Sequence, residues 1–142
     1  MPQTSAEPII HVIDDEAPLR RSLIFLLESA GWVAVGHASA ESFLDAMPAL
    51  PAAGGCLVLD IRMPGMSGLE LQQRLAALAS PWPIVFMTGH GDAEMAAHAL
   101  AAGAVAFLRK PFRDQALLDA VESAVAASES RLMQDCALTD SD

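Results

Sequence analysis

Five side chains with reactive or charged groups stand at the ends of short apolar runs in the sequence. Asp14 and Asp15 follow the first run, Asp60 ends the third, Thr88 ends the fourth, and Lys110 follows the fifth. The carboxyl ends of parallel strands meet at one edge of a sheet, and ligands bind at that edge in open α/β folds. We therefore expect these five side chains to converge, although they lie far apart in the sequence.

The three carboxylates in this set favour a divalent cation. Carboxylates gathered at one edge repel one another, and burial raises their pKa values further. Hard oxygen ligands suit Mg²⁺, which binds proteins through one or two carboxylates together with waters and phosphate oxygens of a substrate. The pattern therefore indicates phosphoryl chemistry.

The lysine and the hydroxyl point the same way. Lys110 is the only lysine of the 142 residues, and its ammonium can neutralise part of a transferring phosphoryl group. Thr88 adds a hydroxyl donor, and Asp60 can serve as the nucleophile that forms an acyl phosphate. Taken singly, Asp60 is equally well explained as a turn residue, and the Asp14–Asp15 pair, Thr88 and Lys110 are better explained as turn or surface residues. The prediction therefore depends on their joint placement.

The elements that must position these groups alternate strictly along the chain. Apolar runs predict strands at residues 9–13, 33–35, 56–60, 84–88 and 104–108. Helical spacing predicts helices at residues 18–30, 40–47 (with Ser39 as N-cap), 67–78, 93–102 and from about 114 onward. Such alternation predicts a parallel sheet with helices on both faces. The second strand brings only Gly36 and His37 to the edge of the sheet where the other strands deliver the reactive side chains, and the pattern assigns them no role.

The chain is predicted to form one domain. We expect a flexible leader over residues 1–8, a domain over 9–128, and a polar tail over 129–142 that starts an interdomain linker. Only the first part of the tail is expected to extend the last helix. The loop at residues 48–55 contains two prolines and two glycines.

Composition excludes several classes of function. A formal net charge of −10 argues against direct nucleic-acid binding and against an anionic membrane surface. No apolar stretch is long enough to span a bilayer, and no signal peptide is recognisable, so a cytoplasmic location is expected. Cys56, in an apolar run, and Cys136, in the tail, are both expected to be free thiols, with Cys56 in the core.

Four segments of the sequence match a known pattern. They are Val12-Ile13-Asp14-Asp15-Glu16, then Leu57-Val58-Leu59-Asp60-Ile61-Arg62-Met63-Pro64-Gly65-Met66-Ser67-Gly68, Phe86-Met87-Thr88-Gly89-His90-Gly91-Asp92, and Gly103-Ala104-Val105-Ala106-Phe107-Leu108-Arg109-Lys110-Pro111-Phe112. Over residues 9–128 the chain resembles the receiver domains of two-component response regulators, and within them the FixJ-type branch. The resemblance implies a flavodoxin-like (βα)5 fold, a doubly wound five-stranded parallel sheet of order 2-1-3-4-5.

The resemblance also implies roles for the acidic residues. Asp60 matches the phosphoacceptor of the family. Asp14 and Asp15 match the pair that holds Mg²⁺, with Asp15 as the direct ligand. Asp60 and the backbone carbonyl of Arg62 complete the expected metal ligands.

The remaining matched residues are implied to bind the phosphoryl group and to switch the domain. Thr88 and Lys110 match the phosphoryl-binding hydroxyl and lysine, and the bond before Pro111 is expected to be cis. Thr88 moving inward would let Phe107 rotate inward and repack the face formed by the fourth helix, fifth strand and fifth helix. A plain core role for Phe107 stays open.

The implied partner is a sensor histidine kinase, docked on the first helix, and phosphorylation is expected to favour a homodimer through the switch face. The domain would catalyse only its own phosphorylation and dephosphorylation and is not expected to be an enzyme. Output would be transcriptional through a C-terminal DNA-binding domain that this chain lacks. A stand-alone receiver that acts by protein–protein contacts is the alternative. His11, His37, His90 and His98 show no ligand spacing, although His90 could tune acyl-phosphate hydrolysis.

Two other classes of function compete with this reading. A flavodoxin-like cofactor domain would need a Gly- and hydroxyl-rich phosphate loop where this sequence has Asp14-Asp15-Glu16. A phosphohydrolase that uses Asp60 as nucleophile would be expected to carry Asp-x-Asp after a strand, which is missing here. Both classes are disfavoured.

Overall fold

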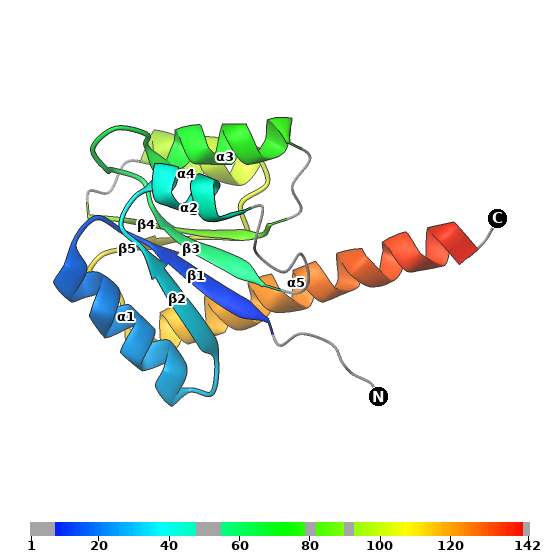
Figure 1. Ribbon diagram of the computed structural model, residues 1–142, viewed down its shortest axis with the longest axis horizontal. Coiled ribbons are helices and arrows are strands. Elements are labelled where there is room, and N and C mark those ends of the chain that lie inside the picture. Colours follow the sequence, from blue (N-terminus) through cyan, green and yellow to red (C-terminus); the bar gives the residue numbers. More distant parts are fainter. Residues whose placement is uncertain (1–7, 48–54, 79–81, 90–92, 141–142) are drawn as a thin grey trace.

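Strands and helices alternate along the whole described chain (Figure 1). The computed structural model describes residues 8–47, 55–78, 82–89 and 93–140, with side chains described as far as residue 127. The strands are β1 (Ile9–Ile13), β2 (Val33–His37), β3 (Cys56–Asp60), β4 (Ile84–Thr88) and β5 (Ala106–Arg109). The helices are α1 (Ala17–Ser29), α2 (Ala40–Ala46), α3 (Gly68–Ala77), α4 (Ala93–Ala101) and α5 (Asp114–Asp140).

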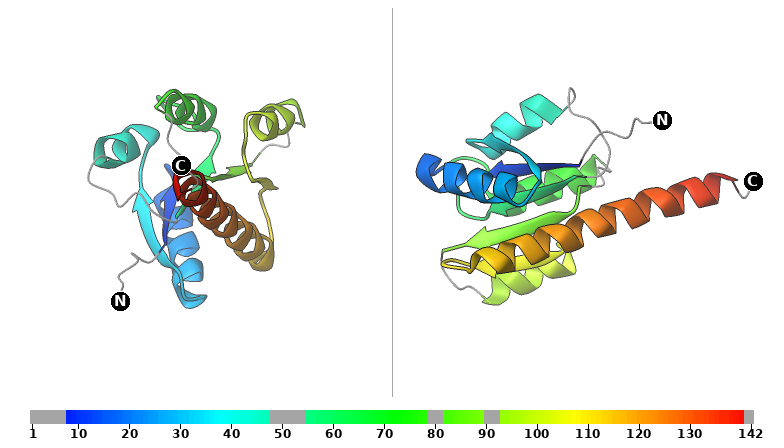
Figure 2. Two further views of the ribbon diagram at one scale, coloured as in Figure 1. Left: turned by 90° about the vertical axis from the view of Figure 1, so that its right-hand side faces the viewer. Right: turned by 90° about the horizontal axis from the view of Figure 1, so that it is seen from below.

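The five strands form one parallel sheet in the order β2-β1-β3-β4-β5. Helices α2, α3 and α4 lie on one face, and α1 and α5 lie on the other, as the two turned views make clear (Figure 2). The predicted doubly wound fold and its strand order are therefore confirmed. The chain reverses its direction of winding between β1 and β3, where a ligand crevice is expected in this class of sheet.

The core has one aliphatic layer on each face of the sheet. Val58 and Met87 point toward α1 and α5, whereas Leu59 and Phe86 point toward α2, α3 and α4. All five residues of β3 and of β4 are buried, as the near-continuous apolar runs predict for central parallel strands. Cys56 is part of the first layer, as predicted, and burial raises the pKa of its thiol to about 12.

Helix ends follow local signals in the sequence. The Ser39 side chain accepts a hydrogen bond from the Ser42 amide, which confirms the predicted N-cap. Ser67 and Glu70 form a reciprocal capping box that starts α3 beside the end of β3. Gly103 follows α4 with φ 109°, a conformation that glycine adopts without steric cost.

Three boundaries differ from the predictions by two residues or more. β2 continues to His37, because pairing with β1 extends it beyond its apolar residues. β5 begins at Ala106 rather than Ala104, because the Ala104 amide still bonds to Ala99 at the end of α4. α5 runs to Asp140, much further into the predicted tail than expected, and projects past the sheet (Figure 1). No glycine or proline interrupts that stretch.

Other predictions of domain organisation are not tested. Residues 1–7 of the predicted leader and 48–54 of the predicted loop lie outside the described residues. The division into leader, domain and linker therefore stays a prediction. No helix in the described part of the chain is both long and apolar enough to cross a lipid bilayer.

Two histidines meet beneath α2, which sequence spacing did not predict. Nδ1 of His11 on β1 lies 3.0 Å from Nε2 of His37 on β2, and the rings of Phe43 and Trp82 stand edge-on to His11. His11 is fully buried, and its Nε2 has no hydrogen-bond partner among the described residues. Desolvation, together with the nearby His37, lowers the pKa of His11 from 6.5 to about 4.

This burial predicts that acid weakens the fold. Between about pH 6.5 and pH 4 the unfolded chain binds a proton at His11 that the folded chain does not, so stability falls as pH falls through that window. We expect the wild type to lose about 2 kcal/mol more unfolding free energy than His11→Phe between pH 7 and pH 5, measured by urea denaturation. Equal losses in the two proteins would contradict a neutral, buried His11.

Candidate functional site

The structure brings the sequence-predicted site residues to one edge of the sheet. Asp14 and Asp15 follow β1, Asp60 ends β3, Thr88 ends β4, and Lys110 follows β5. Asp14, Asp60 and Thr88 are buried, whereas Asp15 is exposed. The predicted convergence is therefore present, with one solvent-exposed carboxylate, that of Asp15, and two buried carboxylates, those of Asp14 and Asp60.

Lys110 links two of the carboxylates. Its Nζ lies 3.2 Å from Oδ2 of Asp60 and 3.4 Å from Oδ2 of Asp14, and 19% of its side chain is exposed. The amide of Lys110 donates to the Thr88 carbonyl at 2.7 Å, which fixes the lysine backbone beside β4. The Lys110–Pro111 peptide bond is cis, as predicted.

Backbone amides hold the other carboxylate oxygens. Oδ1 of Asp14 accepts from the Glu16 amide at 2.8 Å, and Oδ1 of Asp60 accepts from the Arg62 amide at 3.2 Å. Each carboxylate thus has one oxygen fixed by its own turn and the other turned toward Lys110. Gly68 permits the tight turn after β3, because a β-carbon there would lie 2.4 Å from the Asp60 carbonyl oxygen.

Burial and charge act in opposite directions on this cluster. Desolvation and the neighbouring Asp14 raise the pKa of Asp60 above its ordinary 3.8, and the Lys110 ammonium offsets this only in part. Desolvation alone would lower the pKa of Lys110, but the Asp60 and Asp14 carboxylates outweigh it and raise that pKa. The site therefore holds a firmly protonated lysine against carboxylates whose charge is poorly solvated.

The acidic residues fit a divalent cation. One carboxylate oxygen from each of Asp14, Asp15 and Asp60 can be chosen so that all three lie within 4.8 Å of one another. Three hard oxygen donors at one edge of the sheet suit Mg²⁺ better than a softer metal. The structure does not test the predicted ligand role of the Arg62 carbonyl.

The residues of the predicted switch lie next to one another in the sheet. Phe107 of β5 pairs with Phe86 of β4, and Thr88 pairs with Arg109 in the same ladder. Phe107 is half-buried against the layer that faces α4, with its ring centroid 6.3 Å from that of Phe86. Both the switch role and the plain core role of Phe107 are compatible with this position. His90 lies outside the described residues.

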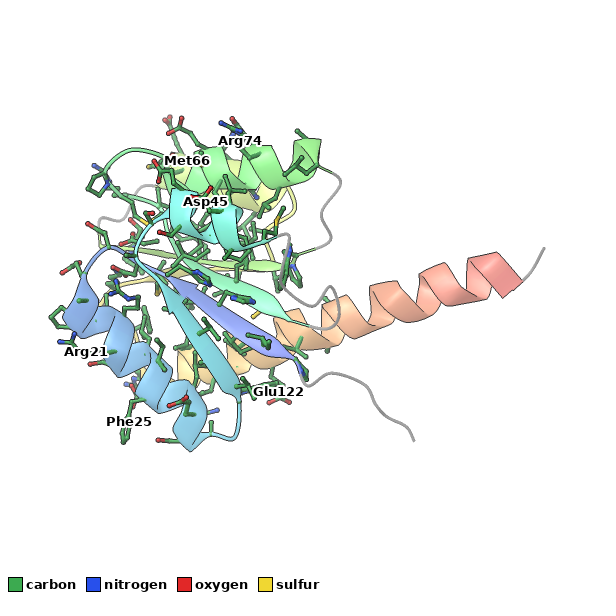
Figure 3. All side chains as sticks on the ribbon, in the orientation of Figure 1. Arg21, Phe25, Asp45, Met66, Arg74 and Glu122 are labelled. Atoms are coloured by element: carbon green, nitrogen blue, oxygen red, sulfur yellow. The ribbon has the colours of Figure 1, made fainter. Side chains whose placement is uncertain are left out.

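An apolar groove beside the site was not predicted. It has a volume of about 690 Å³ and runs between α1 and the segment that follows Lys110. Its lining includes Leu19, Leu26 and Phe112. Phe25 also lines it with 73% of its surface exposed, and Figure 3 shows this side chain pointing away from the body of the domain. The sequence carried one signal for this groove. Phe25 lies between the buried positions Leu23 and Leu27 of α1, so this large apolar side chain falls off the buried face of the helix.

Comparisons with known proteins agree on one family. The family "Response regulator receiver domain" matches residues 10–122. The transcriptional regulatory protein FixJ of Bradyrhizobium diazoefficiens is 51% identical over 84% of this chain and 58% of its own length. The nodulation protein W of the same organism is 46% identical over 91% of this chain and 56% of its own length. The chain therefore spans less than two thirds of these relatives.

Solved structures give the same picture. The crystal structure of FixJ-N has a TM-score of 0.79 and 43% identity over 86% of this chain and 96% of that one. A low-resolution structure of the response regulator StyR has a TM-score of 0.87 and 43% identity over 95% of this chain and 67% of that one. Both likenesses extend over most of this chain.

Proposed function

The chain belongs to the response regulator receiver domain family, and from this membership we propose that Asp60 accepts a phosphoryl group from the phosphohistidine of a sensor histidine kinase. The observation that carries the proposal is the position of Lys110, the chain's only lysine, within 3.4 Å of both Asp14 and Asp60. A cation placed there can neutralise charge on a phosphoryl group that arrives at Asp60. The domain is a signalling element that modifies itself and does not turn over an external substrate.

The transfer is a displacement at phosphorus. An oxygen of the Asp60 carboxylate attacks the phosphorus, the bond from phosphorus to the donor's imidazole nitrogen breaks, and its electron pair stays on that nitrogen. Asp60 must be unprotonated to attack, and the Lys110 ammonium favours that state. Most of the catalysis then comes from position and charge, as is general for phosphoryl transfer.

The acidic residues have the second role in this proposal. The carboxylates of Asp14, Asp15 and Asp60 and the backbone carbonyl of Arg62 would hold Mg²⁺. When bound, Mg²⁺ supplies positive charge that neutralises phosphoryl oxygens. The site's three carboxylates and single lysine support this assignment, because the ammonium alone leaves an excess of negative charge.

Phosphorylation would then act on the rest of the domain through Thr88. The new phosphoryl oxygens accept from its hydroxyl and from Lys110, and the inward move of Thr88 leaves space for Phe107. The face formed by α4, β5 and α5 repacks and favours a homodimer. Because relatives named as transcriptional regulators are longer than this chain, we propose that transcription is the output of the whole protein.

The kinase would dock on the groove beside α1. Lys110 is among the residues that line the groove and pairs with Asp60, so a kinase seated against α1 would carry its phosphohistidine close to Asp60. The exposed Phe25 ring offers the largest apolar contact along that path. Apolar groups that are exposed in a free protein are common at partner interfaces.

Replacement of Phe25 with aspartate is expected to slow transfer from the kinase about 10-fold or more while leaving phosphorylation by acetyl phosphate within about two-fold of wild type. The small donor needs only the site, whereas the kinase also needs the groove. Rates with the two donors, measured side by side, separate the two requirements. As a surface control, a change of the exposed Glu122 on α5 to lysine should affect neither rate. Equal slowing of both donors in Phe25→Asp would contradict docking on this groove.

The proposed function is tested by the intact mass of the wild type after incubation with acetyl phosphate, with and without Mg²⁺. We expect a gain of one phosphoryl group that depends on Mg²⁺. No gain by a folded protein that binds Mg²⁺ would overturn the proposal.

A further inference from the structure

Arg20 reaches from α1 back to the acidic turn after β1. Its Nη1 donates a hydrogen bond of 2.6 Å to the backbone carbonyl oxygen of Asp14. The amide of Arg20 itself donates to the Glu16 carbonyl at 2.9 Å, within the first turn of the helix. The side chain therefore closes a loop between the start of α1 and the end of β1.

The carbonyl that Arg20 holds belongs to the peptide group between Asp14 and Asp15. On the other side of Asp14, the amide donates to the His37 carbonyl of β2 at 3.2 Å. With the Glu16 and Lys110 bonds to its carboxylate, every polar atom of Asp14 has a partner. The geometry of this residue is fixed from four directions.

Asp15 has no such support of its own. Its side chain is exposed, and its carboxylate has no hydrogen bond or ion pair among the described residues. The direction of its side chain is therefore set by the backbone, above all by the plane of the peptide that precedes it. Arg20 is the side chain that holds that plane.

Gly36 on β2 makes room for this arrangement. A β-carbon at Gly36 would lie 3.0 Å from Cδ and 3.2 Å from Cγ of Arg20, and 2.8 Å from Cδ1 of Ile24. Any larger residue would push the stem of Arg20 away from the sheet. The residue at the end of β2 that the sequence left without a role thus provides the path for the arginine.

We propose that Arg20 is a positioning residue for the acidic pair, holding the Asp14–Asp15 peptide so that the Asp15 carboxylate faces the cation site. The inference rests on the proposed function for the identity of that site. The hydrogen bonds of Arg20 among the described residues go to the backbone of Asp14 and Glu16 and not to Asp60, so its effect is expected on cation affinity rather than on the transfer step. Partners that orient metal ligands in this way typically change metal affinity 10- to 100-fold.

The test compares Arg20→Ala with Arg21→Ala by calorimetric titration of Mg²⁺ into the folded protein. Arg21 is the adjacent arginine of α1, is exposed, and projects to the outside in Figure 3. We expect the Mg²⁺ dissociation constant to rise about 10-fold in Arg20→Ala and to stay within about two-fold of wild type in Arg21→Ala. Arg20→Lys, which keeps a charged donor, should recover part of the loss.

Kinetics distinguish positioning from simple loss of stability. In Arg20→Ala the Mg²⁺ concentration for half-maximal phosphorylation by acetyl phosphate should rise with the dissociation constant, while the rate at saturating Mg²⁺ returns to within about three-fold of wild type. Gly36→Ala should show the same defect, because it displaces Arg20 from the Asp14 carbonyl. The double variant should be no worse than Arg20→Ala, because both changes disrupt that same contact.

Unchanged Mg²⁺ affinity in Arg20→Ala, even with a lower melting temperature, would overturn the inference and leave Arg20 as a packing residue. A wild type that binds no Mg²⁺ would overturn it as well. If the wild type binds Mg²⁺ but gains no phosphoryl group, the proposed function fails while the affinity comparison still decides the role of Arg20.

Discussion

Replacement of Asp60 with asparagine is expected to abolish the gain of a phosphoryl group, with a fall in rate of about 1,000-fold or more. The amide keeps the size of the side chain but has no anionic oxygen to attack phosphorus. Because burial raises the pKa of Asp60, its charge opposes folding, and loss of that charge should leave the domain folded. Intact mass after incubation with acetyl phosphate and Mg²⁺ measures the result.

Asp45→Asn is the matched control for this experiment. Asp45 lies on the outer side of α2 and is exposed (Figure 3). Its replacement with asparagine changes the net charge by the same amount as Asp60→Asn. This variant should gain one phosphoryl group at the wild-type rate. If Asp60→Asn gained one as well, the acceptor would be another residue, and the transfer mechanism at Asp60 would be wrong.

The fold could be predicted because its signals are local. Apolar runs such as Cys56 to Leu59 are too short for helices and too uniform for a half-exposed strand, so they indicate a buried parallel sheet. Asp60 and Thr88 could be placed at one edge for the same reason, since parallel strands all end there. Once the sheet is parallel, the convergence of the site follows from chain direction alone.

Features that depend on contacts between distant residues could not be predicted. The pairing of His11 with His37 requires the register of β1 against β2, which no local pattern encodes. The passage of Arg20 over Gly36 depends on how closely α1 packs against β2. An arginine on a helix and a glycine in a strand can each have many roles. Only the proximity of Arg20 and Gly36 in the folded chain shows that they act together.

Family membership also decides between the competing classes of function. A flavin-binding domain and a phosphohydrolase share the alternation of strands and helices, so the fold cannot separate them from a receiver. The site favours a receiver over a flavin-binding domain, because the carboxylates of Asp14 and Asp15 after β1 would repel a cofactor phosphate. The match over residues 10–122 then identifies the family.

Replacement of Lys110 with methionine is expected to slow phosphorylation by acetyl phosphate about 100- to 1,000-fold at neutral pH, the usual effect of removing one charge-stabilising donor. Two physical effects contribute. The transferring phosphoryl group loses the ammonium at its oxygens. The pKa of Asp60 also rises further, because Lys110 is the main group that lowers it, ahead of the Arg62 amide, so a smaller fraction of Asp60 is the attacking carboxylate.

The pH profile separates these two effects. The wild-type rate should fall as pH drops through the raised pKa of Asp60, and in Lys110→Met the same fall should occur at higher pH. At high pH Asp60 is ionised in both proteins, so the part of the rate loss that persists there measures only the missing charge stabilisation of the phosphoryl group.

Arg109→Met removes an equal charge from the neighbouring, exposed position and should leave both the rate and the profile close to wild type. A profile for Lys110→Met that matches this control would mean that Lys110 only fills space between Asp14 and Asp60. The distance of 3.2 Å between Lys110 Nζ and the Asp60 carboxylate argues against such a purely space-filling role. An ammonium at that distance also interacts with a phosphoryl group that becomes bonded to the carboxylate.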